Sequence, residues 1–288
     1  MIFLFAAAIL CFTIQNITFK KFNLSYMKNT ANYFIFNALY FVLICGIYVV
    51  VGIDPSLFNL ASVGLALLFA TSFISAIFFY MKAMEHGPLG MSFLFFSSGM
   101  LLPIIFGVVV LSEPVLVHNL VGLVLLFIAF VVSVYGKGEG KMNKTWLMYI
   151  LLSAVTNGVI GIAIKMSRMV ISEYALIEFL FLGFGQAAII SLIIGVIITL
   201  KYKMPLAHFS SAMFVIVVIA TAISTAFGNY LMVRLSFVVS AMVQFPVMSG
   251  SLVITSIISS RLVYKEQITK KHVAAIVVGL AAIVLLSL

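Results

Sequence analysis

Long apolar runs separated by short polar segments dominate the chain. The runs are about 20 residues long, the length that an α-helix needs to cross the hydrocarbon core of a bilayer. Polar or helix-breaking residues mark most of the breaks, as at Asp54-Pro55, Gly87-Pro88 and Gly136-Lys137. The pattern predicts ten membrane-spanning helices at 2–19, 31–52, 61–81, 89–112, 116–135, 145–164, 174–200, 211–233, 237–261 and 271–288.

The composition agrees with a chain surrounded by lipid. Apolar residues make up 65% of it and charged residues 8%, with a mean hydropathy of +1.31, whereas soluble domains are about 45–50% apolar. The net charge of +9 lies mostly between the apolar runs, where cations face headgroups, so we expect no nucleic-acid partner. Cys11 and Cys45 both lie inside apolar runs, which leaves no disulfide framework and no metal site. We therefore expect an all-α membrane protein without a metal or other cofactor.

The first apolar run has no basic segment before it, and Lys20 and Lys21 follow it. A secretory signal peptide has the opposite order, with its positive charges ahead of the apolar part. We therefore expect the run to be retained as the first helix.

The two halves of the chain contain matching features about 150 residues apart. The matching pairs are Tyr80 with Tyr230, Ser98 with Ser249, and Glu113 with Glu266. They predict a first repeat at 1–136, a polar linker at 137–144 and a second repeat at 145–288, with five helices in each repeat. Because five is odd, the second repeat enters the membrane with the opposite orientation, as in many secondary transporters.

Lys and Arg are unevenly distributed between the two sides that this arrangement defines. Segments after odd-numbered helices carry Lys20, Lys21, Lys28, Lys82, Lys137, Lys141, Lys144, Lys201, Lys203, Arg261, Lys265, Lys270 and Lys271. Segments on the other side carry Lys165, Arg168 and Arg234. Since cytoplasmic loops are enriched in these residues, the odd-numbered loops are expected in the cytoplasm and both termini outside.

Several motifs in the third to fifth helices are similar to those of a known family. They are Tyr80-Met81-Lys82-Ala83, Gly87-Pro88-Leu89-Gly90, Leu101-Leu102-Pro103, Leu111-Ser112-Glu113-Pro114 and Asn119-Leu120-Val121-Gly122. The chain resembles the ten-helix, EamA-type members of the drug/metabolite transporter superfamily in these motifs, in its length and in its duplication. The resemblance is most specific over residues 80–136 and weaker over 230–288. It implies a carrier of small solutes, often an exporter of amino acids, other metabolites or drugs, with the substrate held between the two halves.

The chain also departs from this family. Many relatives have an arginine in the second helix, where this chain has Asn37, and a Trp-Gly pair in the first, where it has Thr13-Ile14-Gln15-Asn16. The resemblance therefore does not identify the substrate. Relatives are also commonly drawn with cytoplasmic termini, which is opposite to the orientation that the Lys and Arg distribution favours here.

Polar side chains deep in the predicted spans are the candidates for a solute pathway, because they are costly in hydrocarbon unless they face another helix or water. The amides are Gln15, Asn16, Asn37, Asn157, Gln186, Asn229 and Gln244, and the selected hydroxyls are Ser72, Ser98, Ser249, Tyr80 and Tyr230. Hydrogen bonds between helices are the alternative explanation for any single amide, but as a set the amides favour a polar cavity. The two tyrosines, each followed by a cation, could equally be anchors at the membrane interface or gates at its two mouths.

Prolines and carboxylates complete the set of candidates. Pro103 and Pro246 remove amide donors inside spans, so we expect helix kinks that free carbonyls near a central site. Glu113 and Glu266 are placed at helix ends, where a backbone amide or a local cation could satisfy them. Glu178 is the one acid placed inside a span, close enough to its end to reach water. Since the first helix has no acid, the sequence favours a facilitator or exchanger over proton coupling through Glu178, or through His86 or His118.

These features predict a carrier in the cytoplasmic membrane that moves a small polar or amphipathic solute by alternating access between the repeats, with export as the expected direction. A structural or scaffolding membrane protein is the alternative, and it would contain mutually satisfied amides. An enzyme is not expected, because the spans contain no HExxH, no GxSxG and no paired Asp. The expected partners are a small-molecule substrate and the bilayer, and a homodimer is left open.

Overall fold

The computed structural model describes residues 1–86, 89–134, 144–204, 211–265 and 270–288. This described part is helical throughout, with short connections and no strand. Its elements are α1 (Ile2–Ser25), α2 (Thr30–Val51), the 3-10 turn η1 (Pro55–Leu57), α3 (Leu60–His86), α4 (Leu89–Ser98), α5 (Leu101–Val109), α6 (Val117–Val134), α7 (Lys144–Val170), α8 (Leu176–Tyr202), α9 (Ala212–Val238), α10 (Ala241–Tyr264) and α11 (Lys270–Ser287). The predicted all-α architecture is confirmed.

Seven of the described helices are long and apolar enough to cross a membrane: α1, α2, α3, α7, α8, α9 and α10. Three shorter apolar stretches, Phe95–Val109, Val117–Val132 and Val273–Leu286, fall in the remaining predicted spans. The chain is therefore a multi-pass membrane protein. Within the described ranges, the helices occupy the ten segments that the apolar pattern predicts, and α4 and α5 share the fourth.

The interruption between α4 and α5 lies four residues before Pro103. Because Pro103 has no N–H, the carbonyl of Gly99 accepts instead from Leu102 at 3.1 Å, and Met100 donates to Ser97 O at 3.2 Å. These shorter turns separate α4 from α5. Pro246 lies inside α10, which runs on through it.

Several helices extend beyond the ends of their apolar runs. The helix α7 continues to Val170, although its predicted span ends at 164. Lys165, which the sequence assigns to a loop facing headgroups, is in fact inside this helix and fully buried. The loop assignment of Lys165 is wrong because a lysine ends an apolar run without ending a helix.

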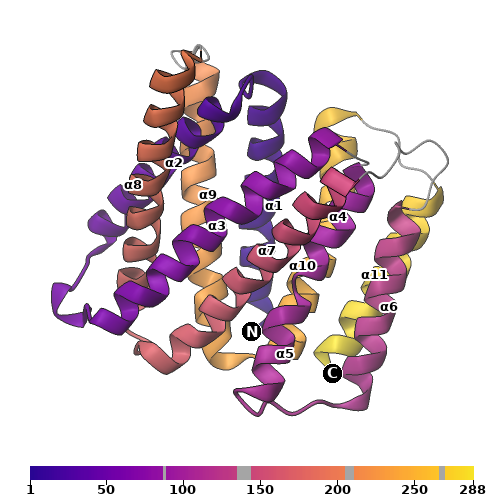
Figure 1. Ribbon diagram of the computed structural model, residues 1–288. Helices are drawn as coiled ribbons and strands as arrows, with labels where there is room; N and C mark the ends of the chain where they lie inside the picture. Colours follow the sequence, from indigo (N-terminus) through magenta and orange to yellow (C-terminus); the bar gives the residue numbers. More distant parts are fainter. Residues whose placement is uncertain (87–88, 135–143, 205–210, 266–269) are drawn as a thin grey trace. The chain divides into compact units, whose positions relative to one another are not determined.

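The chain divides into two compact units. Unit 1 comprises Met1–Thr71 and Ser167–Arg234, and unit 2 comprises Ser72–Met166 and Leu235–Leu288. In unit 1, α2 and α8 lie side by side (Figure 1). They run antiparallel, since Cys45 lies against the carbonyl of Phe181 while Gly195, near the other end of α8, lies against Ile35. Hydrogen bonds from α1 and α2 to α9 complete this unit.

In unit 2, α6 packs along α11 (Figure 1). A Cβ on Gly122 would meet Leu286 Cγ at 2.8 Å, so the two helices approach as closely as a glycine allows. The helix α7 is fastened to its neighbours by buried polar contacts: Trp146 Nε1 donates to Ser92 Oγ at 2.8 Å, and Ser153 Oγ donates to Ala76 O at 2.8 Å.

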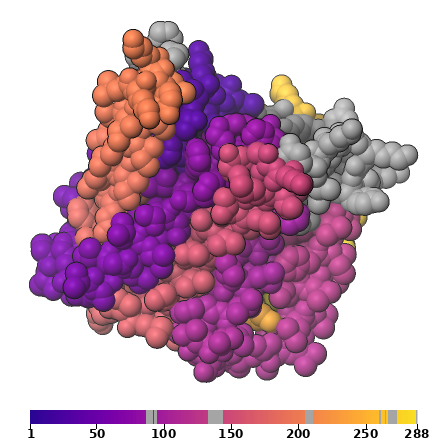
Figure 2. Space-filling view, viewed as in Figure 1, coloured from indigo at the N-terminus to yellow at the C-terminus, as the bar shows by residue number. Residues whose placement is uncertain are grey.

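The outer sides of the helices are apolar. Figure 2 shows the second half of α8 at the surface, and its outward residues are Ile189, Leu192, Ile193, Val196, Ile197 and Leu200. An exposed apolar side of this length is the surface that a helix presents to lipid. Polar side chains of the spans are therefore mostly inside, where they need partners within the protein.

The close approach of α7 at the α4–α5 interruption gives a first test. A Cβ on Gly99 would press on the carbonyl oxygen of Ala154 and lie 3.1 Å from Gly158 N, and backbone atoms of α7 cannot rotate away. We expect Gly99→Ala to lower the free energy of unfolding by about 1–3 kcal/mol, measured as a lower Tm in detergent. Gly46→Ala is the matched control, because no atom lies within 4 Å of its Cβ position. Equal Tm values for the two variants would contradict the described packing.

Candidate functional site

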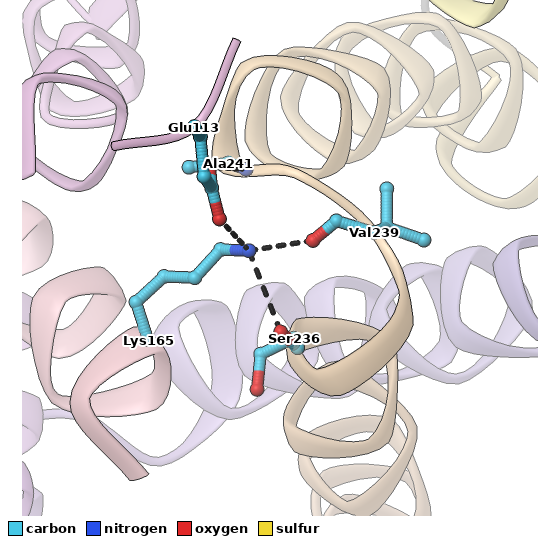
Figure 3. Close-up of polar contacts among 5 residues, drawn as sticks. All are labelled: Glu113, Lys165, Ser236, Val239 and Ala241. Atoms are coloured by element: carbon cyan, nitrogen blue, oxygen red, sulfur yellow. Dashed lines mark hydrogen bonds and ion pairs between the residues drawn. The ribbon is translucent and has the colours of Figure 1, made fainter. Parts of the chain in front are cut away.

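An ion pair is buried in unit 2. The ammonium of Lys165 is fully buried and lies 3.1 Å from Glu113 Oε1, whose side chain is 8% exposed. Lys165 Nζ also donates to the carbonyl of Val239 at 2.6 Å and to that of Ser236 at 3.5 Å (Figure 3). Three acceptors thus surround an ammonium that has three donors.

Glu113 is satisfied on both carboxylate oxygens. Oε1 accepts from Lys165, and Oε2 accepts the backbone N–H of Ala241 at 2.5 Å. Ala241 is the first residue of α10, while Ser236 lies in the last turn of α9 and Val239 directly follows that helix. The carboxylate of Glu113 therefore lies at the N-terminus of α10, and the ammonium of Lys165 lies at the C-terminus of α9. The dipoles of both helices favour this arrangement of charges.

The turn after α5 places Glu113 in this position. Ser112 has a positive φ of 52°, and the N–H of Glu113 returns to the carbonyl of Gly107 at 3.0 Å. A Cβ on Gly107 would meet Glu113 Oε2 at 2.6 Å and Ala241 Cβ at 2.7 Å. Glycine is required at 107 because the carboxylate and the start of α10 fill that space.

The predicted polar residues of unit 1 form a second polar region. Gln15 Nε2 donates to Thr225 Oγ1 at 2.8 Å, and Asn229 Nδ2 returns to Thr225 O at 2.9 Å. One turn along, Thr221 Oγ1 donates to Thr18 Oγ1 at 2.9 Å. These contacts join α1 to α9 by buried hydrogen bonds. Asn16, by contrast, is exposed on α1.

Asn37 differs from the other amides. It is fully buried in the middle of the buried face of α2, which also carries Tyr33, Tyr40, Ile44 and Tyr48. The Tyr33 phenol is near enough to interact with the amide, but neither Nδ2 nor Oδ1 of Asn37 completes a hydrogen bond. The hydroxyl of Tyr40, one turn further on and also fully buried, has no hydrogen-bond partner either. Three buried polar atoms within one helical turn are thus left without hydrogen bonds.

The predicted residues of unit 2 have mainly structural contacts. Asn157 Nδ2 donates to Phe96 O at 3.0 Å, and Ser98 Oγ returns to Phe95 O at 2.6 Å. The ring of Tyr80 packs at 4.8 Å from that of Phe96, centroid to centroid. Ser72 and Gln244 are buried, and Ser249 is half-buried.

The remaining predicted residues are dispersed. Gln186 Nε2 donates to Val63 O at 3.3 Å, while its Oε1 has no hydrogen-bond partner. Tyr230 is half-buried near the end of α9. Glu178 is buried at the start of α8. Glu266, the predicted counterpart of Glu113, lies outside the described residues.

Two site residues were missed from the sequence. Lys165 was taken for a headgroup-facing cation, and the phenol of Tyr40 was not singled out among eleven tyrosines. The helical spacing from Asn37 to Tyr40 could have indicated the second of these, because residues three apart share a helix face.

Comparison with known proteins identifies the fold but not the family. No family model matches the chain, and no curated protein matches it. A solved crystal structure, described only as that of a protein, matches with a TM-score of 0.76 and 12% sequence identity. The match covers 98% of this chain and 94% of that chain. At this identity the likeness establishes the fold alone.

The buried ion pair predicts a large effect on stability. We expect Lys165→Met to lower the free energy of unfolding by about 3–5 kcal/mol, because it leaves the carboxylate of Glu113 buried without its cation. The double variant Lys165→Met/Glu113→Gln should recover part of this loss, since a neutral amide can still accept from Ala241 N–H. Denaturant unfolding in detergent measures both values.

The exposed pair of Lys82 and Glu85 provides the control. Their side chains are 25% and 45% exposed and approach to 2.9 Å. Lys82→Met should change stability by no more than about 1 kcal/mol. A loss in Lys165→Met as small as that would contradict the burial of the inner pair.

Proposed function

We propose that the protein is a secondary transporter of the cytoplasmic membrane, of the ten-helix drug/metabolite transporter type. It moves a small polar or amphipathic solute, such as an amino acid, another metabolite or a drug-like compound, by alternating access between two inverted repeats. Export is the expected direction. The family and the solute class come from the resemblance in residues 80–136 and from the amide-rich spans.

The observation that carries the proposal is Asn37. A buried polar group without a hydrogen bond lowers the stability of a protein by about 1–3 kcal/mol. In Asn37 both the donor Nδ2 and the acceptor Oδ1 are such groups. A scaffold protein gains nothing from such a group, and leucine would be more stable there. A carrier needs neutral donors and acceptors that are free to bind its solute, so the cost is understandable as part of a binding site.

The packing of the helices supports the inverted repeats. The second helices of the two predicted repeats, α2 and α8, pack on each other, as do the fifth helices, α6 and α11. The fourth helix of the first repeat, in its α5 part, packs on its counterpart α10. The pairs run antiparallel: Gly122 near the start of α6 meets Leu286 near the end of α11, and Gly279 meets Ala129. Contact between antiparallel counterparts is what a two-fold axis in the membrane plane would produce.

The distribution of polar contacts also argues against the scaffold alternative. The scaffold alternative predicts amides whose hydrogen bonds are all made within the protein. Gln15 fits this prediction, since it donates to Thr225, and so does Asn157, which donates to Phe96 O. Asn37, Tyr40 and Gln186 each retain at least one buried polar atom without a hydrogen bond. We therefore prefer the carrier to the scaffold.

Asn37→Leu tests the proposal. We expect this variant to be at least as stable as the wild type, because it removes unsatisfied polar atoms, and yet to lose solute exchange by tenfold or more. Counterflow in proteoliposomes loaded with pooled amino acids, nucleosides and small organic cations measures the exchange, and Tm in detergent measures the stability.

Asn157→Leu is the matched control. It removes the hydrogen bond to Phe96 O, so its stability should fall by about 0.5–1.5 kcal/mol. Exchange that survives in Asn37→Leu at the wild-type rate would remove Asn37 from the site. Absence of exchange in correctly folded wild-type protein would favour the scaffold.

The proposed orientation places the odd-numbered loops in the cytoplasm. Without Lys165, two basic residues, Arg168 and Arg234, remain on the opposite side, so the Lys and Arg asymmetry is stronger than the sequence alone indicated. The proposal keeps both termini outside.

Cysteine labelling in whole cells tests this orientation. In a background with Cys11 and Cys45 replaced by serine, we introduce Tyr174→Cys after α7 or Lys203→Cys after α8, both at exposed positions. A membrane-impermeant maleimide should label the Tyr174→Cys variant and spare the Lys203→Cys variant. The reverse result would mean cytoplasmic termini.

A further inference from the structure

A hydroxyl of α8 shares the condition of Asn37 and Tyr40 in α2. Ser191 is fully buried, and its Oγ has no hydrogen-bond partner among the described residues. A serine or threonine in a helix usually donates to a carbonyl three or four residues back. Thr199 of the same helix does so, with its Oγ1 at 2.8 Å from Gly195 O. Ser191 departs from this pattern, so its hydroxyl is available to another partner.

The packing of α2 on α8 places Ser191 at the level of Asn37 and Tyr40. A Cβ on Gly195 would meet Ile35 Cδ1 at 2.9 Å, and Ser191 lies one turn from Gly195, on the same face of α8. Because the helices are antiparallel, moving from Ile35 to Asn37 and from Gly195 to Ser191 follows the same direction. At 1.5 Å per residue, the level of Ser191 falls between those of Asn37 and Tyr40, within about 3 Å of each.

Aromatic rings surround these polar side chains. The ring of Tyr40 lies 5.9 Å from that of Phe19, 5.2 Å from Phe36 and 4.3 Å from Phe41, centroid to centroid. Phe41 lies 5.5 Å from Phe184 of α8. The faces of such rings are apolar surfaces on which the C–H groups or a flat ring of a solute can pack.

The charged residues of α2, α8, α9 and the first part of α3 lie away from this level. In α8 they are Lys201 and Glu178, ten and thirteen residues from Ser191, which is about 15 and 20 Å along the helix axis. There is none in α2 or in the α3 segment Leu60–Thr71, and α9 has only Arg234, near its end. The remaining ones described in unit 1 outside α1 lie at helix ends or in connections: Lys28, Asp54, Arg168, Glu173 and Lys203.

The two lysines of α1 lie on another side of their helix. Lys20 and Lys21 are half-buried. The side of α1 that meets α2 carries Phe19 and Phe22, whose rings lie 6.1 and 3.8 Å from that of Phe36. Residues three apart share a helix face, and the two residues between them do not. Lys20 and Lys21 are therefore directed away from α2.

We propose that Asn37, Tyr40 and Ser191 form one binding site, and that its solute is uncharged and rich in hydroxyl groups, as nucleosides and sugars are. Each of the three side chains can both donate and accept a hydrogen bond, and each hydroxyl of such a solute can do the same. An ammonium or a carboxylate would find no opposite charge at this level, and its burial would be costly. The inference rests on the proposed function and narrows its class of solute.

The place of this site is consistent with alternating access. The helix α2 belongs to the first predicted repeat and α8 to the second, so the site lies between the repeats. Because the three side chains are fully buried, the solute reaches them when α2 and α8 separate.

Counterflow in proteoliposomes loaded with one class of solute at a time tests the class. The wild type should exchange nucleosides or monosaccharides, and it should exchange amino acids and small organic cations at least tenfold more slowly. Exchange of amino acids or cations at an equal or higher rate would overturn the solute class and leave the transporter proposal intact.

Ser191→Ala tests the site. We expect this variant to raise the solute concentration for half-maximal exchange by about two- to tenfold, the effect of one lost hydrogen bond. Its Tm in detergent should not fall, because the hydroxyl has no partner in the protein. Thr199→Val is the matched control and should leave the half-maximal concentration unchanged, since that hydroxyl is bound within α8. The wild-type value in Ser191→Ala, or an equal rise in both variants, would remove Ser191 from the site.

Binding is measured without transport by the Tm of the purified full-length protein. Pooled nucleosides or pooled monosaccharides should raise the Tm of the wild type, and the rise should be smaller in Ser191→Ala and in Asn37→Leu. If the wild type exchanges nothing, the proposed function fails, and such a selective rise still supports the site. A wild type whose Tm neither pool raises would overturn the site.

Discussion

Hydrocarbon offers no hydrogen bond to a polar side chain, and this constraint determines where the polar residues of this chain lie. Many hydroxyls return to a carbonyl of their own helix, as Ser98 does with Phe95 and Thr199 with Gly195. Amides such as Gln15 and Asn157 reach a neighbouring helix. Because most buried polar groups of the described helices have partners in this way, the few that have none carry most of the information about function.

The ion pair of Lys165 and Glu113 follows from the same constraint applied to the backbone. The turn between α9 and α10 is two residues long, so it brings the last carbonyls of one helix and the first N–H of the next into the interior. A lysine and a glutamate satisfy both sets of groups and each other (Figure 3). The side chains of the pair have partners for all their donors and for both carboxylate oxygens. The pair therefore holds α7, α9, α10 and the turn after α5 together, and it has no free group with which to bind a solute.

The helices could be predicted from the sequence because the length of an apolar run and the thickness of a bilayer are directly related. The partners of the polar residues could not. Lys165 and Glu113 are 52 positions apart in the sequence, and hydropathy treats a lysine as the end of a span whether it faces headgroups or a carboxylate. Asn37 and Asn157 are equivalent in the sequence as amides within apolar runs. The side chain of Asn157 donates to the carbonyl of Phe96, which lies just before the interruption between α4 and α5. Neither Nδ2 nor Oδ1 of Asn37 has such a partner.

The two buried carboxylates show how one residue type acquires two roles from its surroundings. Glu113 has a cation and a helix N-terminus, so its negative charge is compensated and removing a partner is costly. Glu178 also lies at a helix N-terminus, but among the described residues it receives one backbone N–H and no cation, and its second oxygen has no hydrogen-bond partner. Glu113 therefore has a partner for each of its oxygens, whereas Glu178 has one for Oε1 alone. Because a buried oxygen without a hydrogen bond costs free energy, Glu178 holds the start of α8 less firmly than Glu113 holds the start of α10.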